Sequence, residues 1–266
     1  MTKLLVIGGG KMGEALLGGL ISAGWATPSD IVVVEPDPVR AEVLRSGHGV
    51  TVGGSMAAAF DGCERFEGAL IAVKPQMVAA VCSELAGRVG RVLSIAAGVT
   101  IATIEAALAD GTPVIRSMPN TPALVGLGAS AIAGGAWSTE ADLGWASEIL
   151  GAVGVVERVG EALLDAVTGL SGSGPAYVFL VAEALVDGAV AQGIPRAVAV
   201  TLAHQTIAGA GQMLVQSGDQ AAVLRANVTS PGGTTAAGLR ELEDRSVRSA
   251  FIEAIAAATQ RAKELG

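Results

Sequence analysis

The sequence predicts an α/β protein, with a doubly wound sheet over residues 1–160 followed by an all-α domain over residues 161–266. Three observations support this prediction. A glycine-rich turn at residues 8–13 joins the first apolar run to the first helical pattern. Short apolar runs then alternate with helical patterns up to about residue 160, which is typical of a mostly parallel sheet with helices on both faces. From Glu161 onward only helical periodicity remains.

Composition and charge argue against several classes of protein. The net charge of −8 disfavours a nucleic-acid partner. No apolar run approaches the ~18 residues of a membrane span, and Met1-Thr2-Lys3 enters an apolar run without the pattern of a secretory signal. Cys63 and Cys82 have neither metal-ligand spacing nor a disulfide framework. We therefore expect a cytoplasmic protein with no bound metal and no membrane partner.

The first strand is expected over residues 3–7 and the first helix over residues 14–21. The turn between them reads G-x-G-x-x-G, the fingerprint of a Rossmann-like dinucleotide site. Its first glycine permits the turn, its second lets the backbone approach a pyrophosphate, and its third lets the helix pack on the strand. The residues predicted to contact the dinucleotide here are Gly8, Gly9, Gly10, Lys11, Met12 and Gly13.

The second strand, expected over residues 31–34, ends at Glu35, where a ribose-binding acid belongs. A carboxylate at this position accepts hydrogen bonds from the ribose hydroxyls and repels a 2′-phosphate. Arg40, five residues later, could instead receive that phosphate. The alternative for Glu35 is a solvated charge at the end of a strand.

Further strands are expected over residues 69–73, 92–96, 113–116, 129–133 and 154–159, with helices over 76–86, 100–109 and 139–151. In a parallel sheet, ligands bind at the carboxyl ends of the strands. Five unusual segments fall at such ends, namely residues 8–13, Glu35, 74–75, 96–98 and 118–122. Their shared position favours one binding site over five unrelated loops.

The helical domain is divided at residues 171–175, 193–195 and 230–233. Pro175 and Pro195 suit first helical positions. The helix over residues 175–192 is almost wholly apolar and must be buried on most sides. We therefore expect this domain to pack against a second copy of the chain.

The stretch Ser230-Pro231-Gly232-Gly233 is expected to form a tight turn that leads into a helix near Thr234. Serine and threonine suit the helix cap, and the free N–H groups of a helix start can bind a small anion such as a carboxylate. The alternative is an ordinary cap between two packed helices.

The usual acids of carbonyl reduction are missing. Tyr177 is the single tyrosine, and position 181 is Val181 where short-chain dehydrogenases carry lysine. His48, expected in a loop, and His204, expected in mid-helix, have no carboxylate beside them in sequence. A protonated C=N bond becomes a neutral amine on hydride transfer, so its reduction needs positioning and a modest hydroxyl rather than a strong acid.

The sequence resembles the pyrroline-5-carboxylate reductases, which carry out the last step of proline synthesis. The resemblance covers essentially the whole chain. The motifs that carry it lie, in family order, at residues 8–13, Ala72-Val73-Lys74-Pro75, 116–122, 165–177 and 228–235. It implies a Rossmann-type domain and a helical domain that dimerises by interleaving helices and binds substrate.

The resemblance also implies site residues. The reduced nicotinamide cofactor, NADPH or NADH, should contact Ser55, Val73, Lys74, Pro75, Ile95, Ala96, Ala97 and Asn227. We add Asn120 to these cofactor contacts; the alternative is that Asn120 is only a turn residue between two prolines. Pyrroline carboxylate should contact Ser230, Gly233, Thr234 and Thr235, with the Thr235 hydroxyl as the catalytic group facing the ring nitrogen and Glu161 also touching the substrate. Glu35 departs from members with a small residue there and leaves the choice of cofactor open.

Three other functions compete with this one. They are reduction of another imine or keto acid, a non-catalytic dinucleotide sensor, and a purely structural helical dimer. The Ser230–Thr235 segment argues against the sensor, because a sensor needs no anion site for a substrate. The five segments at one edge of the sheet argue against the structural dimer.

Overall fold

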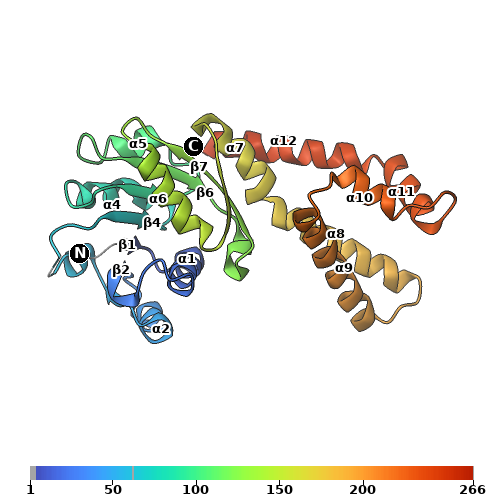
Figure 1. Ribbon diagram of the computed structural model, residues 1–266, viewed down its shortest axis with the longest axis horizontal. Helices are drawn as coiled ribbons and strands as arrows, with labels where there is room; N and C mark the ends of the chain where they lie inside the picture. The colour runs from blue at the N-terminus through green and yellow to red at the C-terminus, as the bar shows by residue number, and fades with distance from the viewer. Residues whose placement is uncertain (1–3, 62, 266) are drawn as a thin grey trace. The chain divides into compact units, whose positions relative to one another are not determined.

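The computed structural model describes residues 4–61 and 63–265 (Figure 1). It divides into two compact units, which are described separately: residues up to Ser173 together with Ala257 onward, and Gly174–Ala256. The expected first strand began at Lys3, which lies outside the described residues.

The first unit contains an eight-stranded sheet in the order β3-β2-β1-β4-β5-β6-β7-β8. Strands β1 to β6 are parallel, β7 is antiparallel to β6, and β8 is parallel to β7. The doubly wound, mostly parallel sheet is therefore confirmed. The strands are β1 (Leu4–Ile7), β2 (Ile31–Val34), β3 (Thr51–Gly53), β4 (Gly68–Ile71), β5 (Val92–Ser94), β6 (Val114–Met118), β7 (Gly128–Gly134) and β8 (Gly154–Arg158).

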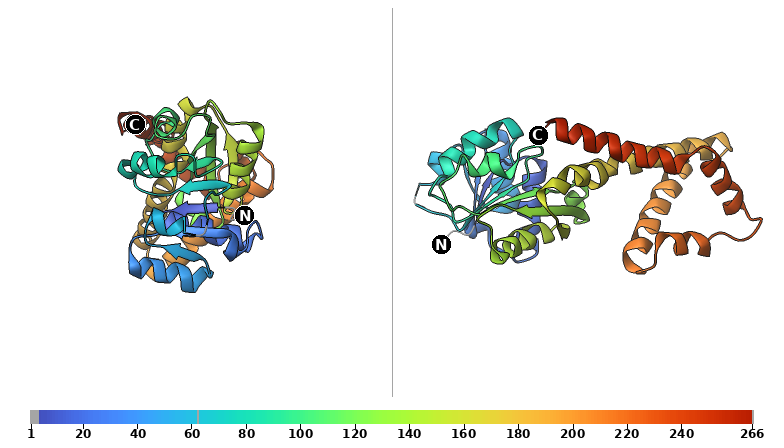
Figure 2. Two further views of the ribbon diagram at one scale, coloured as in Figure 1. Left: turned by 90° about the vertical axis from the view of Figure 1, so that its left-hand side faces the viewer. Right: turned by 90° about the horizontal axis from the view of Figure 1, so that it is seen from above.

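Helices cover both faces of this sheet (Figure 2). They are α1 (Lys11–Ser22), α2 (Pro38–His48), α3 (Met56–Ala59), α4 (Val78–Leu85), α5 (Ile101–Glu105), α6 (Glu140–Gly151) and α7 (Leu164–Val167). Short 3-10 turns lie at Pro28–Asp30, Pro75–Met77, Thr121–Val125 and Glu161–Leu163.

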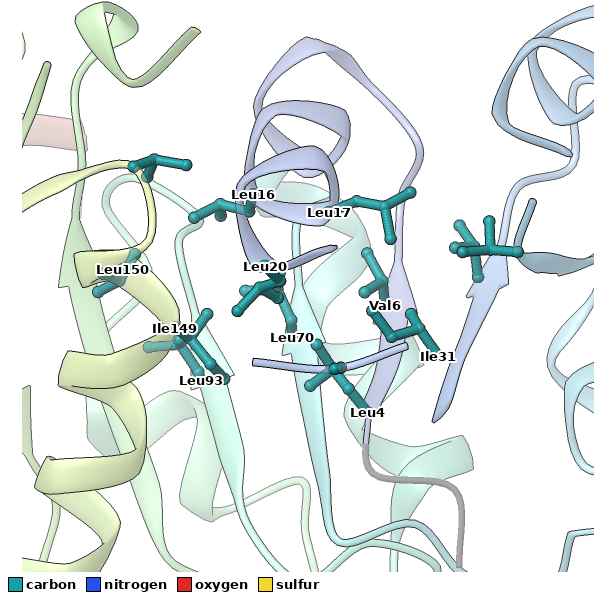
Figure 3. Close-up of a cluster of buried hydrophobic side chains, with 14 of the residues drawn as sticks. Leu4, Val6, Leu16, Leu17, Leu20, Ile31, Leu70, Leu93, Ile149 and Leu150 are labelled. Atoms are coloured by element: carbon teal, nitrogen blue, oxygen red, sulfur yellow. The ribbon is translucent and has the colours of Figure 1, made fainter. Parts of the chain in front are cut away.

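Alternating side chains of β1 supply two separate cores. Leu4 and Val6 join the cluster beneath α1 and α6, whereas Leu5 and Ile7 join the cluster on the opposite face. Figure 3 shows the first cluster, in which leucines of α1 and residues of α6 pack over β1, β2, β4 and β5. This period of two, with both sets fully apolar, is what a strand buried on both faces requires.

The second unit is entirely helical, as expected. Its elements are α8 (Gly174–Ala191), α9 (Arg196–Gln216), α10 (Ala221–Asn227), α11 (Thr234–Asp244) and the first part of α12 (Val247–Leu265). Pro195 is the residue before α9 rather than its first helical residue.

Two local expectations were wrong. The predicted break at residues 171–175 is only a local irregularity, because the π-helical segment Thr168–Gly172 and the bend at Ser173 lie inside a helical stretch that continues from Glu161 to Ala191. His48 does not lie in a loop, because it is the last residue of α2. The strand β3 and the helix α3 are too short to show periodicity in the sequence.

The second unit exposes much of its apolar surface. Its buried cluster contains only Val186, Ala199 and Ala203, whereas Phe179 and Leu180 on α8 are 63% and 66% exposed. By length and composition alone, the stretch Glu161–Ala191 could cross a membrane. Asp187 on the same helix pairs with Arg196 at 2.8 Å, and Glu183 lies one turn before it. Charged side chains are costly in hydrocarbon, so this face favours a covering second protein chain over lipid.

The uncovered face of α8 generates a prediction about assembly. Phe179→Asp places a charge on this apolar face and should raise the dissociation constant of the dimer by at least ~30-fold in analytical ultracentrifugation, because interface aromatics contribute strongly to association. Val39→Asp, at an exposed position of α2, is the matched control and should not change it. An unchanged dimer in Phe179→Asp would contradict burial of this face by a second copy.

Candidate functional site

The turn between β1 and α1 depends on glycine at two positions. Gly8 has a φ of 103°, and a Cβ there would lie 2.5 Å from the carbonyl oxygen of Ala72. A Cβ on Gly13 would lie 2.2 Å from the carbonyl oxygen of Gly8. Both approaches are impossible for any other residue, so the turn and the close packing of α1 require these glycines.

Gly10 has a different role, because a Cβ there would meet no protein atom within 4 Å. It is the N-cap of α1 and supplies no side-chain cap. The first intrahelical bond joins the N–H of Glu14 to the carbonyl oxygen of Gly10, so three N–H groups of the first turn precede it. An open helix start of this kind can bind a phosphate.

Glu35 lies directly after β2, beside the glycine turn. Its Oε2 accepts a hydrogen bond from the N–H of Gly9 at 2.9 Å, and its Oε1 accepts one from the N–H of Asp37 at 3.0 Å. Arg40 also contacts this turn, since its Nε donates to the carbonyl oxygen of Gly9 at 2.5 Å. The predicted acid and the predicted cation therefore both bind the backbone of Gly9, one at its N–H and the other at its carbonyl oxygen.

The other predicted cofactor residues of the first unit follow strand ends. Ser55 comes after β3 and caps α3, with its Oγ accepting from the N–H of Ala58 at 3.3 Å. The remaining two segments are residues 73–75, after β4, and residues 95–97, after β5. Because β1 to β5 are parallel, all of these segments lie along one edge of the sheet.

Asn120 is buried and its side-chain amide is engaged at both ends. Its Oδ1 accepts from the N–H of Ala129 at 2.8 Å, and its Nδ2 donates to the carbonyl oxygen of Ser171 at 3.1 Å. The side chain thus joins β7 to the π-helical segment. This geometry suits a positioning residue better than a direct cofactor ligand.

Glu161 lies in an ion-pair cluster that was not predicted. Its Oε1 accepts from Arg116 Nη1 at 3.0 Å and from the N–H of Ile101 at 2.7 Å. Arg116 is buried in β6, and its Nη2 also lies 3.8 Å from Asp165. The signal for this cluster was present, because a charged residue inside an apolar strand requires a charged partner.

The Ser230–Gly233 turn forms as predicted, in the second unit. The N–H of Gly233 donates to the carbonyl oxygen of Ser230 at 3.0 Å, and Gly232 has a φ of 69°. Proline followed by glycine at the two central positions is typical of a type II turn.

The helix after this turn, α11, begins at Thr234 as expected, but its cap differs from the expectation. The N-cap is Gly233, without a side-chain hydrogen bond, so the predicted serine or threonine cap was wrong. The N–H of Gly233 is already used by the turn. The first intrahelical bond runs from Ala237 to Gly233, which leaves the N–H groups of Thr234, Thr235 and Ala236 ahead of it.

The described part of the chain shows no arrangement of side chains that would bind a metal ion. Within residues 4–61 and 63–265, no group of three or more His, Cys, Asp or Glu side chains could hold a metal ion.

Asn227, predicted to contact the cofactor, is the last residue of α10 and is exposed in the single chain.

The cluster around Arg116 generates a prediction about stability. Glu161→Gln should lower the free energy of unfolding by ~1–3 kcal/mol, because it leaves a buried guanidinium without its nearest charge. Glu140→Gln removes the exposed partner of Arg158, 2.6 Å away, and should cost less than ~0.5 kcal/mol. Urea unfolding measures both, and equal losses would show that the buried cluster contributes no more than a surface pair.

Two family models match the chain. One, described as pyrroline-5-carboxylate reductase dimerisation, covers residues 161–265, and one described as NADP oxidoreductase, coenzyme F420-dependent, covers residues 3–98. Among curated proteins, the pyrroline-5-carboxylate reductase of Synechocystis sp. is 45% identical over 266 residues, covering 99% of this chain and 98% of that protein. The enzyme of the same name from Methanosarcina acetivorans is 44% identical, with the same two coverages.

Solved structures of pyrroline-5-carboxylate reductases are also similar to this chain. A pyrroline-5-carboxylate reductase from Coxiella burnetii has a TM-score of 0.94 and 35% identity, covering 100% of this chain and 98% of the other. The Plasmodium falciparum pyrroline carboxylate reductase with NADP bound has a TM-score of 0.85 and 28% identity, with the same coverages. The glycine turn, the Ser-Pro-Gly-Gly turn and these full-length similarities lead to one conclusion: the chain belongs to the pyrroline-5-carboxylate reductase family.

Proposed function

We propose that this protein reduces the C=N bond of 1-pyrroline-5-carboxylate with NADH or NADPH and so forms L-proline, the last step of proline biosynthesis. The observation that supports this most strongly is the full-length similarity at 44–45% identity to proteins of that name. It extends over both the glycine turn at residues 8–13 and the Ser230–Thr235 segment.

We assign residues 1–160 to cofactor binding and residues 161–266 to dimerisation and substrate binding. The match of residues 161–265 to a dimerisation domain and the exposed apolar face of α8 support a homodimer. We place it in the cytoplasm, where the free thiols of Cys63 and Cys82 would stay reduced.

The edge of the sheet suits a pyridine dinucleotide. The open N-terminus of α1 can bind the pyrophosphate, and the carboxylate of Glu35 lies where a ribose would bind. The segments after β3, β4 and β5 line the same edge and complete the cradle that we assign: Ser55, Val73, Lys74, Pro75, Ile95, Ala96 and Ala97, with Asn227 from the helical part. When bound, the reduced nicotinamide supplies the hydride.

The start of α11 suits a substrate carboxylate. The N–H groups of Thr234 and Thr235 precede the first intrahelical bond, and the helix dipole favours an anion there. Ser230 closes the adjacent turn. We assign the Thr235 hydroxyl to the ring nitrogen, where it orients the iminium and then hydrogen-bonds to the amine that forms.

Reduction of a protonated C=N bond does not require a strong general acid or base. The hydride adds to the ring carbon of the C=N bond, and the electron pair of the π bond moves to the protonated nitrogen, which becomes a neutral amine. Positioning therefore contributes most of the rate, as in other reactions that depend on holding two partners in line. We assign Glu161 and Asn120 to positioning, because the protein itself binds the Oε1 of Glu161 and both ends of the Asn120 amide.

The role of Thr235 can be tested by steady-state kinetics with pyrroline-5-carboxylate. Thr235→Ala should lower kcat by ~10–1000-fold, the typical cost of removing a positioned donor. Thr235→Ser should recover most of the activity, whereas Ser217→Ala, in the turn after α9, should have no effect. Unchanged turnover in Thr235→Ala would remove this residue from the reaction.

The carboxylate after β2 predicts the choice of cofactor. NADH should be at least competitive with NADPH in the wild type. Glu35→Ser should raise the NADPH-to-NADH ratio of kcat/KM about tenfold. Removing one repulsive carboxylate beside the 2′-phosphate should favour NADPH binding by ~1.4 kcal/mol, which corresponds to that ratio. A flat ratio would mean that Glu35 does not face the ribose.

A further inference from the structure

Arg40 is a cationic side chain that contacts the glycine turn, and it forms an ion pair with Glu14. We propose that Glu14 is a specificity-determining residue: by pairing with Arg40, it withholds the guanidinium from a 2′-phosphate and so favours NADH. This inference rests on the proposed function, since it assumes that a dinucleotide binds along residues 8–13 and Glu35.

The contacts of Arg40 leave its guanidinium little freedom. The residue lies in the first turn of α2, which begins at Pro38. Its Nη2 donates to Oε2 of Glu14, and its Nε donates to the carbonyl oxygen of Gly9. Its side chain is about one quarter exposed, at 26%. Turning the guanidinium away from these two partners would break both hydrogen bonds.

Glu14 is itself held in place. It lies in the first turn of α1, and its Oε1 lies 3.4 Å from Nε2 of His48 at the end of α2. The hydrogen bond from Arg40 holds the pKa of the Glu14 carboxyl below its usual value, so the carboxylate stays charged at neutral pH. The pair therefore joins α1 to α2 directly behind the glycine turn.

The charges around the ribose position then favour one cofactor. Glu35 is fixed by the N–H groups of Gly9 and Asp37, and it can accept from ribose hydroxyls. A 2′-phosphate would bring almost two negative charges beside this carboxylate. The cation that could offset them is Arg40, which is already neutralised by Glu14. The two carboxylates thus act together: Glu35 would repel the 2′-phosphate, and Glu14 pairs with the Arg40 side chain that could otherwise bind it.

Isothermal titration of the full-length protein with NADH and NADPH, without substrate, tests the proposal directly. Glu14→Gln should lower the Kd for NADPH about tenfold, as expected when a charged donor is freed for a phosphate. The Kd for NADH should change by less than about threefold. Glu14→Ala repeats the measurement with a different side chain, and thermal unfolding verifies that each variant is folded.

A double variant tests whether tighter NADPH binding comes from the released Arg40 guanidinium or only from the loss of one negative charge. In Glu14→Gln/Arg40→Ala the tighter binding of NADPH should disappear, because the released guanidinium is its cause. Glu42→Gln is the matched control: it removes one negative charge from α2, where Glu42 pairs with Arg45 at 3.4 Å, and should leave both Kd values unchanged.

Three results would overturn the proposal. They are no tightening for NADPH in either Glu14 variant, a tightening that persists without Arg40, and a wild type that binds neither nucleotide. The proposed function fails separately. A protein that shows the expected binding pattern but does not oxidise NADH with pyrroline-5-carboxylate would retain this inference and lose that reaction.

Discussion

The close contact between Gly13 and the carbonyl oxygen of Gly8 is the constraint on which the cofactor site depends. A side chain at Gly13 would begin 2.2 Å from that oxygen, so α1 reaches the turn only because residue 13 lacks one. The contact brings the start of α1 to the carboxyl end of β1, between β2 and β4, where the strand order reverses. Dinucleotides bind at this kind of position because helix N–H groups and strand ends converge there.

A second set of contacts fixes the beginning of the helical region to the sheet. Glu161 accepts from Arg116 of β6, and the carbonyl oxygen of Ser171 accepts from Asn120. Ser171 lies in the π-helical segment Thr168–Gly172. Such segments are frequent at functional sites, and this one is held at a defined position by a buried amide. Glu161 and Asn120, both predicted to lie at the site, thus contribute to its architecture.

Much of the fold was predictable because it follows from local patterns. Buried strands such as β1 and β2 are short and wholly apolar, and the glycine turn between β1 and α1 has a distinctive spacing. The start of α11 was predictable from the Ser-Pro-Gly-Gly turn. Strand β3 was missed because three residues carry no period.

The details of the site were less predictable because they depend on contacts distant in sequence. Arg116 and Glu161 are 45 residues apart, and Arg40 and Glu14 are 26 apart. The π-helical segment was read as a break because glycine, serine and proline usually end helices. The cap of α11 was assigned to a hydroxyl residue, but Gly233 occupies that position and leaves the N–H groups open. Local propensity favours a capped helix, whereas an anion site requires an uncapped one.

The most direct measurement compares Gly10→Ala with Gly13→Ala by thermal unfolding and by titration with NADH. Gly13→Ala should lower the unfolding temperature, because its Cβ meets backbone at 2.2 Å. A methyl group on residue 10 would meet no protein atom within 4 Å, so Gly10→Ala should unfold like the wild type. It should nevertheless bind NADH at least ~10-fold more weakly, because the methyl group would occupy the place proposed for the pyrophosphate. Normal NADH binding by Gly10→Ala would contradict the account of this site.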